Sequence, residues 1–510
     1  MELELQKERY NCYRPCTPVV STKEETAETI VPDYCPDIAR IVDASACLLI
    51  RSRTVADGKV SVTGAVRITL LYVAEGSQGL RSLEYSIPAE FDEKLPEGCD
   101  KAATEGRICG VEARALNPRK LFTRLETEWR VTPYCRMTMT VCGEIVDRQK
   151  YSIQTLCEKH DVSLIRSLND KEFVFSDEFS IPRGSDSIAE LLCTSVKPRV
   201  TEAKSVGSKV VLKGAACVSL LYSSPEGKLC SYAEELPFSQ LLDGVAAEEN
   251  ENYSVSATLD LSGCEIHTLA ENGEGRDISV KLFMNAFVAL RCAETVDCII
   301  DLYSTVYELD AQTENVELWQ EPEVTRISQN VREQLETGMS VRNVLSTDVC
   351  FGVVGIEKNG ARSVLSVPAT LSVLYQDDSG GVFSVRRRAE IKAEADVGED
   401  ALASVEAVCA SDISANVNSL GIELRFAADF TVVSLAAPQC SCLTSLSAAL
   451  PEAGEDSAPS LVLRALGESE SLWDVAKQYR TTVEDILSAN ELADGAVPEI
   501  GQMLLIPRNR

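Results

Sequence analysis

The chain has 510 residues, a length that corresponds to about three to four domains of ordinary size. Its 79 Asp and Glu residues outnumber the 49 Lys and Arg residues, so the formal net charge is −30. A chain this acidic repels phosphate groups, which argues against nucleic acid and a bare membrane surface as partners. Histidine occurs only at His160 and His267, and this scarcity excludes most imidazole-based catalytic and metal sites.

The N-terminal sequence predicts a protein that is not exported. It begins MELELQK, where a signal peptide would place a basic segment before an apolar one. No run of about 18 apolar residues follows anywhere in the chain, so we expect no membrane insertion. Both observations favour a cytoplasmic protein.

The 19 cysteines agree with a reducing compartment. They are odd in number and scattered, and no CxxC occurs; the nearest pairs are Cys12/Cys16 and Cys440/Cys442. Many lie in apolar runs, such as Cys217, where a free thiol behaves as a small apolar side chain. We expect reduced, buried, structural cysteines and no metal site, because no second pair completes one around Cys12 and Cys16.

An internal repeat organises most of the chain. The segment KVSVTGAVRITLLY at 59–72 matches KVVLKGAACVSLLY at 209–222 with an offset of 150 residues and no gap. A weaker third copy, VLSVPATLSVLY at 364–375, has an offset of 303. Apolar and polar residues alternate in each copy, which predicts a half-buried antiparallel strand.

A second alternating segment closes each unit, at 121–131, 278–290 and 422–426. The fold class expected is therefore mainly β, with three antiparallel β-sandwich-like domains. The segment 36–42 could form a helical turn or an edge element, and periodicity does not decide between them. We expect the three domains at residues 1–155, 165–310 and 320–442.

Residues 443–460 have the composition of a linker, because small residues, two prolines and acids without bases predominate. The tail at 461–508 reads as strand, helix, helix, strand. Apolar residues at helical spacing predict a helix near 471–479, and Thr481 or Thr482 can cap a second one.

This tail resembles the LysM family through SLWDVAKQYRTTVEDILSAN at 471–490 and IGQMLLIP at 500–507. The repeats resemble clostridial SPOCS-domain proteins through VPDYCPDIARIV at 31–42, the strand at 64–72 and NPRKL at 117–121. The LysM family usually has a glycine at its first turn, which this chain has lost.

The SPOCS resemblance implies a non-enzymatic scaffold for assembly of the spore coat and cortex. Its members act in the mother-cell cytoplasm at the forespore surface, where they bind the coat basement-layer ATPase SpoIVA. LysM alone implies the alternative, a cell-wall protein that binds peptidoglycan through N-acetylglucosamine. Neither resemblance implies a cofactor, and no catalytic motif such as GxxxxGK[ST], GxGxxG, HExxH or GxSxG occurs.

The LysM resemblance places a ligand or partner groove between the first turn and the loop from helix to strand. Some residues of this region have a structural alternative to ligand contact. The small core of the domain could instead be filled by Leu472, Trp473 and Ile500, and the end of a helix could be capped by Asn490. We expect the two histidines to be structural and Arg386-Arg387-Arg388 to form a solvated strand edge. The groove would be formed by Ser469, Glu470, Ser471, Leu472, Asn490, Leu492, Glu499 and Ile500.

Overall fold

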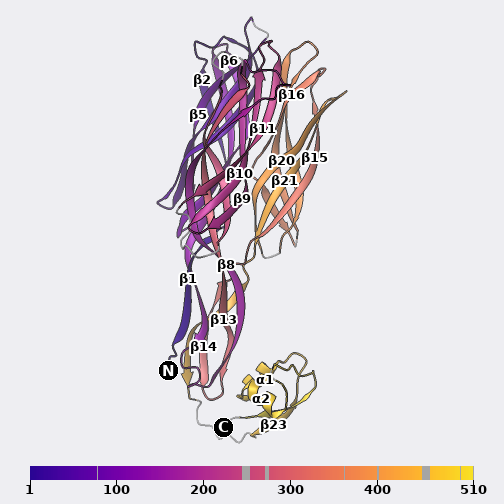
Figure 1. Cartoon of the computed structure of the whole chain (residues 1–510). Helices are drawn as coiled ribbons and strands as arrows, with labels where there is room; N and C mark the ends of the chain where they lie inside the picture. The colour runs from indigo at the N-terminus through magenta and orange to yellow at the C-terminus, as the bar shows by residue number, and fades with distance from the viewer. Residues whose placement is uncertain are drawn as a thin grey trace.

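The structure, a computed structural model, describes residues 1–76, 79–243, 253–269, 275–360, 362–398, 401–450, 460–493 and 495–508. Strands make up most of it, and within these ranges two helices occur, both in the LysM-like tail. The predicted mainly β fold class is confirmed. Figure 1 shows an upper body of packed sheets, a narrower stalk below it and the small tail domain beside the stalk.

The first unit is a sandwich of a three-stranded sheet and three strands of a seven-stranded sheet that continues into the second unit. Alternation along its central strands buries one side chain in two, including Ile68 and Leu70 from one sheet and Leu121 and Leu125 from the other. The segment 36–42 forms part of an edge strand, not a helical turn. One sheet has the order β3 (Ile38–Ala56), β4 (Lys59–Ala74), β5 (Leu80–Lys94), and the other has β2 (Val19–Ile30), β7 (Lys120–Ile145), β6 (Cys99–Asn117).

The second and third units repeat this strand order. In the third, two short strands replace the long first edge strand of the other units. The second unit comprises β8 (Ile153–Ser180), β9 (Glu190–Val206), β10 (Lys209–Ser223), β11 (Leu229–Leu242), β12 (Tyr253–Thr268) and β13 (Asp277–Ser304). The third comprises β15 (Glu323–Glu336), β16 (Asn343–Phe351), β17 (Gly355–Asn359), β18 (Arg362–Gln376), β19 (Val382–Asp396), β20 (Leu402–Asn418) and β21 (Gly421–Leu435).

The stalk consists of three two-stranded ribbons, one from each unit. β1 (Leu5–Pro15) pairs with the end of β7, and the start of β8 pairs with the end of β13. β14 (Glu308–Glu317) pairs with β22 (Gln439–Ala449). Apolar side chains from all three ribbons fill the space between them, so the stalk has a core of its own.

Two of the expected boundaries differ from the structure. Residues 443–449, assigned to a linker by composition, belong to β22, where Leu443 and Leu446 are buried in the stalk. Their small polar neighbours gave the segment a linker-like composition. The rest of that segment up to residue 459, except Leu450, lies outside the described residues. The gap expected between 155 and 165 falls within β8, which runs from the stalk into the second sandwich without a break.

The three units are related by an approximate threefold arrangement. Each packs its third strand against the first strand of the next unit, as β5 on β9, β11 on β16 and β19 on β3. One apolar cluster joins Leu71, Leu221 and Leu374, which are separated by the repeat offsets of 150 and 303 residues. Equivalent positions of the repeat therefore meet at one point between the units.

Polar contacts also hold the units together. Arg386 Nη1 donates to the Val111 carbonyl oxygen at 2.7 Å, and Arg388 Nη2 lies 2.8 Å from Glu126 Oε2. These arginines lie exposed on β19, an edge strand of its sheet, as expected, and they also bind the first unit. The repeat places another sheet beside this edge, which the sequence of one strand does not reveal.

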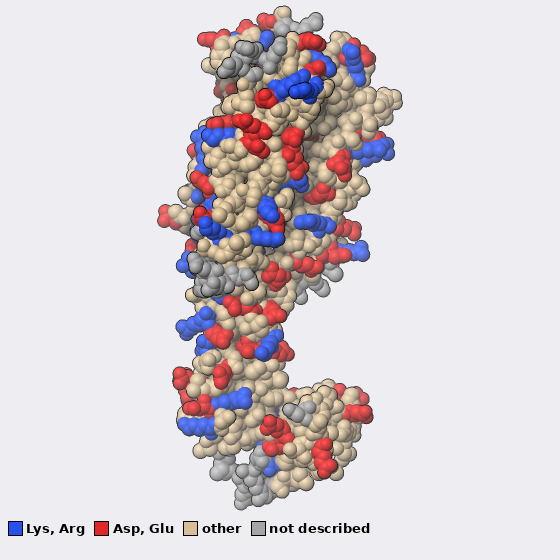
Figure 2. Space-filling model, in the orientation of Figure 1, with Lys and Arg blue, Asp and Glu red and all other residues tan. Residues whose placement is uncertain are grey.

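Acidic and basic side chains are interspersed over the face of the body shown in Figure 2. Many form ion pairs with neighbours, such as Arg53 with Asp260 between the first and second units. Neither helix in the described part of the chain has the length and apolar character needed to cross a membrane.

Candidate functional site

The tail domain has the predicted order of strand, helix, helix and strand. Its elements are β23 (Leu461–Ala465), α1 (Leu472–Tyr479), α2 (Val483–Ala489) and β24 (Met503–Pro507). Ser471 caps α1 and Thr482 caps α2, each through a side-chain oxygen that accepts a backbone N–H three residues later. Val475, Ala476 and Ile486 fill the core between the helices and the two strands.

The first turn is fixed by its own polar contacts. Glu470 forms an ion pair with Arg464 and accepts the Gly467 N–H at 3.1 Å. Ser471 and Asp474 form a reciprocal capping box, and these hydrogen bonds lower the pKa of Asp474. Ser469 is exposed at the turn, and Leu472 packs against the core as its structural alternative predicts.

The other predicted groove residues divide into half-buried and exposed positions. Asn490 uses both ends of its amide, donating to the carbonyl oxygens of Ile486 and Leu505 and accepting the Leu505 N–H, each at 2.7 Å. It therefore ties α2 to β24. Leu492 packs against the core, whereas Glu499 and Ile500 are exposed.

Ile500 is 66% exposed, so its expected alternative role in the core is wrong. It lies on a loop that backbone hydrogen bonds hold near the first turn, from Gly501 N–H to Leu466 and from Leu466 N–H to Gln502. The exposed predicted residues Ser469, Glu499 and Ile500 thus lie on two loops that are tied together through Leu466.

A second surface of the domain is apolar. Leu461, Leu463 and Met503 are each more than half exposed on the outer face of the β23–β24 pair, and Leu463 stands opposite Leu505. Residues of this face alternate with the buried Leu504 and Ile506. The strip is a second candidate contact surface, which the groove prediction did not include.

The domain docks on the stalk through α1 and the residues that follow it. Trp473 Nε1 donates to Asp301 Oδ2 at 2.8 Å, and Lys477 forms an ion pair with the same carboxylate. The Tyr303 ring packs edge-on against Trp473 with centroids 4.9 Å apart, and its hydroxyl donates to the Thr481 carbonyl oxygen at 2.8 Å. Tyr303 is thereby part of the core of the tail domain.

These contacts change the proton affinity of both stalk residues. Burial alone would raise the pKa of Asp301, but hydrogen bonds from Lys477, Trp473 and the Leu302 N–H outweigh it and lower the pKa. Burial raises the pKa of Tyr303 to about 12. Sequence reasoning missed this pair, although Asp301 interrupts the apolar run from Cys298 to Tyr303 and could have marked it.

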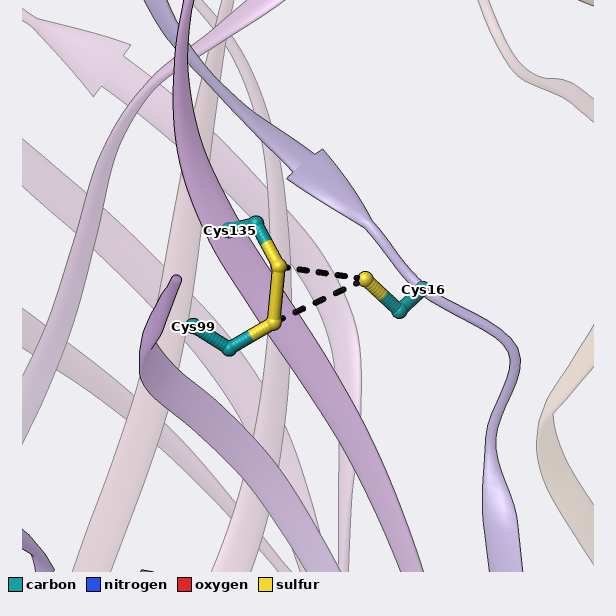
Figure 3. The surroundings of a disulfide bond; sticks show 3 residues. All are labelled: Cys16, Cys99 and Cys135. Carbon is teal, nitrogen blue, oxygen red and sulfur yellow. Dashed lines mark hydrogen bonds between the residues drawn. A yellow bond between two sulfur atoms is a disulfide. The ribbon is translucent and has the colours of Figure 1, made fainter. Parts of the chain in front are cut away.

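The cysteines differ from the expectation at one site. Cys99 and Cys135 form a disulfide between residues that face each other on the paired strands β6 and β7. Figure 3 shows Cys16 beside this bond, with its sulfur 3.4 Å from that of Cys135 and 3.7 Å from that of Cys99. The expectation that all cysteines are reduced is wrong for this pair. Cys99 and Cys135 are 36 residues apart in the sequence, and this spacing alone does not indicate that they pair.

Of two further cysteines, Cys12 is buried as expected and Cys217 is not. Cys12 is separated from Cys16 by the end of β1 and is buried in the stalk. Cys217 is exposed, because it occupies the outward position in the alternation of β10. The apolar run around it marked a strand, and period two should have placed its side chain on the outer face.

Two protein-family models match this chain. The model of the SipL SPOCS domain matches residues 37–115 and 187–267, which cover β3 to β6 and β9 to β12. The LysM domain model matches residues 467–507. No curated protein and no solved structure matches the chain.

The chain therefore combines SPOCS and LysM domains, which are non-catalytic binding or scaffold domains. In this combination it is similar to SipL-type proteins, as the sequence resemblance predicted. The two domain types support a sporulation-related protein of the peptidoglycan-binding type.

Proposed function

We propose that this chain is a non-enzymatic scaffold for spore envelope assembly. It acts in the mother-cell cytoplasm at the forespore surface and binds the coat ATPase SpoIVA through its LysM and repeat domains. The proposal of a protein partner rests on the apolar strip of the LysM domain, which is formed by Leu461, Leu463 and Met503. The combination of SPOCS and LysM domains supports the cellular setting.

The strip is suited to a protein surface. Three large apolar side chains on one face of a two-stranded sheet are costly to leave in water, and covering them is favourable. Docking on the stalk occupies α1 and leaves this face outward. The stalk thus presents the strip to a partner.

The test is a pull-down of SpoIVA from the same organism by the full-length chain. We expect wild-type binding and a loss of at least about tenfold in affinity for Leu463→Asp combined with Met503→Asp, since each buried apolar side chain contributes about 1.5–3 kcal/mol. Leu241→Asp, an exposed leucine on the second unit, is the matched control. Absence of binding by the wild-type chain, or full binding by the double variant, would contradict this role of the strip.

Peptidoglycan binding is the second candidate, because the LysM match covers almost the whole tail domain. The exposed groove residues Ser469, Glu499 and Ile500 would contact the glycan. Sedimentation with purified peptidoglycan tests this: binding that Ile500→Asp removes and the strip variant retains favours the glycan. Binding to SpoIVA that the strip variant loses and Ile500→Asp retains favours the scaffold.

A further inference from the structure

The core of the stalk contains a group of metal-ligating side chains from two ribbons. His160 lies on β8 and Cys298 on the paired strand β13, while Cys440 and Cys442 lie on β22. A ring nitrogen of His160 and the sulfurs of Cys298 and Cys440 all lie within 4.8 Å of one another. The sulfur of Cys442 is 3.6 Å from that of Cys298.

These side chains are largely removed from water. Cys298 and Cys442 are 0% and 1% exposed and Cys440 is 8% exposed, in the apolar cluster that fills the stalk. The Nε2 atom of His160 is buried without a hydrogen-bond partner in the described residues. A buried imidazole nitrogen in that state is energetically costly unless something binds it. Glu158 Oε2, 3.5 Å from this atom, adds a nearby negative charge.

The packing of the stalk does not require thiols at these positions. The closing strands of the first and third units can be aligned by placing Leu121 opposite Ile422. In that alignment Cys440 corresponds to Met139 and Cys442 to Val141. Met139 and Val141 lie in the same buried cluster. Apolar side chains therefore suffice to pack this layer of the stalk. Packing alone does not account for three thiols and an imidazole at one place, and together these groups form a set of metal ligands.

We propose that His160, Cys298, Cys440 and Cys442 bind one zinc ion. Thiolate and imidazole are the ligands that zinc prefers, and three Cys with one His is a common structural set. Sulfurs of a tetrahedral zinc site lie about 3.8 Å apart, given Zn–S bonds of about 2.3 Å. The separation between Cys298 and Cys442 already matches this value, and His160, Cys298 and Cys440 would approach one another by up to about 1 Å. Cys442 lies outside the group within 4.8 Å and would have to move toward His160 to complete the site.

Zinc at this site would join two ribbons whose strands do not pair with each other in the described part of the chain. β8 and β13 belong to the ribbon of the second unit, and β22 belongs to the ribbon of the third. The site lies above the place where the LysM domain docks on β13, since Cys298 precedes Asp301 on that strand. The ion would therefore brace the part of the stalk that carries the LysM domain.

The test uses the full-length chain, purified with reductant, stripped with chelator and titrated with Co²⁺ as a spectroscopic substitute for zinc. We expect one Co²⁺ per chain with thiolate-to-cobalt charge transfer and the strong visible bands of tetrahedral coordination, and displacement by Zn²⁺. We expect a loss of at least tenfold in affinity for His160→Gln and for Cys440→Ala combined with Cys442→Ala. Because His160 is partly exposed, its variant keeps the protein foldable, and circular dichroism verifies the fold.

Two variants serve as controls. Cys12→Ala removes a buried thiol of the same stalk cluster that does not belong to the ligand group, and Cys16→Ser removes the free thiol beside the disulfide. Both should retain the cobalt spectrum. Absence of tetrahedral cobalt in the wild-type chain would overturn the proposal, as would an unchanged spectrum in the folded His160→Gln variant or loss of the spectrum in Cys16→Ser alone. Chelation should also lower the melting temperature of the wild-type chain but not of His160→Gln.

Discussion

Asp301 receives hydrogen bonds from two side chains of α1, and Tyr303 two residues later enters the core of the LysM domain. Both residues belong to the end of β13, so one strand of the stalk provides the main polar and aromatic contacts with the docked domain. Because hydrogen bonds to charged groups contribute more than neutral ones, Asp301 should contribute a large part of the docking free energy.

Replacement of Asp301 by Ala should release the LysM domain from the stalk. Loss of its charged contacts weakens docking by about 1.5–3 kcal/mol. Small-angle scattering should then show a larger radius of gyration, and proteases should cut more readily near residue 460. Asp297→Ala, an exposed carboxylate on the same strand, is the control. Equal compactness of the two variants would contradict the assigned role of Asp301.

Docking should also depend on pH, with a known sign. The pKa of Asp301 is lower in the docked state than its ordinary value of about 3.9, so its contribution is fully present above that value. The contribution is lost as the pH falls through the lowered pKa. Scattering should show constant docking from about pH 5 to pH 8 and release only in stronger acid, with a smaller pH response in Asp301→Asn. Release between pH 5 and pH 8 would contradict this.

At the scale of elements, the LysM domain depends on a side chain that links a helix to a strand. Asn490 makes three hydrogen bonds to backbone groups of α2 and β24. A hydrophobic side chain at this position would leave two backbone groups of β24 without these partners. Its structural role accounts for a residue that the family analogy had placed in the groove.

Asn490→Ala should therefore destabilise the LysM domain by about 1–3 kcal/mol. Hydrogen exchange of the full-length chain should show faster exchange in β24 and α2, with little change in the sandwiches. Ser488→Ala, at an exposed position of the same helix, provides the comparison. If both variants exchange alike, Asn490 does not hold the strand.

Much of the secondary structure could be predicted because burial on one face imposes a period of two. β7 alternates as predicted, and Thr482 is one of the two residues predicted to cap the second helix. β4 and β10 alternate only in part, because Leu71 and Leu221 on their outer faces are buried between the units. Residues 443–449 were missed because their burial depends on the other ribbons of the stalk. Likewise, Asp301 and Trp473 are 172 residues apart, and only tertiary structure brings them together.

At the scale of the whole molecule, the repeat offset identifies equivalent residues that meet between the units, in addition to the similar folds of the units. Leu71, Leu221 and Leu374 occupy the same repeat position and meet in one cluster between the units. Each unit therefore contributes one equivalent side chain to the same interface, and none of the three sandwiches buries this surface alone.

Each of Leu71→Ala, Leu221→Ala and Leu374→Ala should lower the free energy of unfolding by about 2–5 kcal/mol. Since the three side chains share one cluster, the triple variant should cost less or more than the sum of the single changes, which chemical denaturation can measure. Leu241→Ala, at an exposed position, is the control. Additive effects would show that the three leucines do not interact.

The stalk also fixes a length. β1 alone has 11 residues, which at about 3.3 Å per residue extends about 36 Å, and it is paired along this length. A flexible tether of similar residue count would allow its two ends to approach and separate freely. The stalk instead keeps the sandwiches and the LysM domain docked on it at a nearly constant spacing.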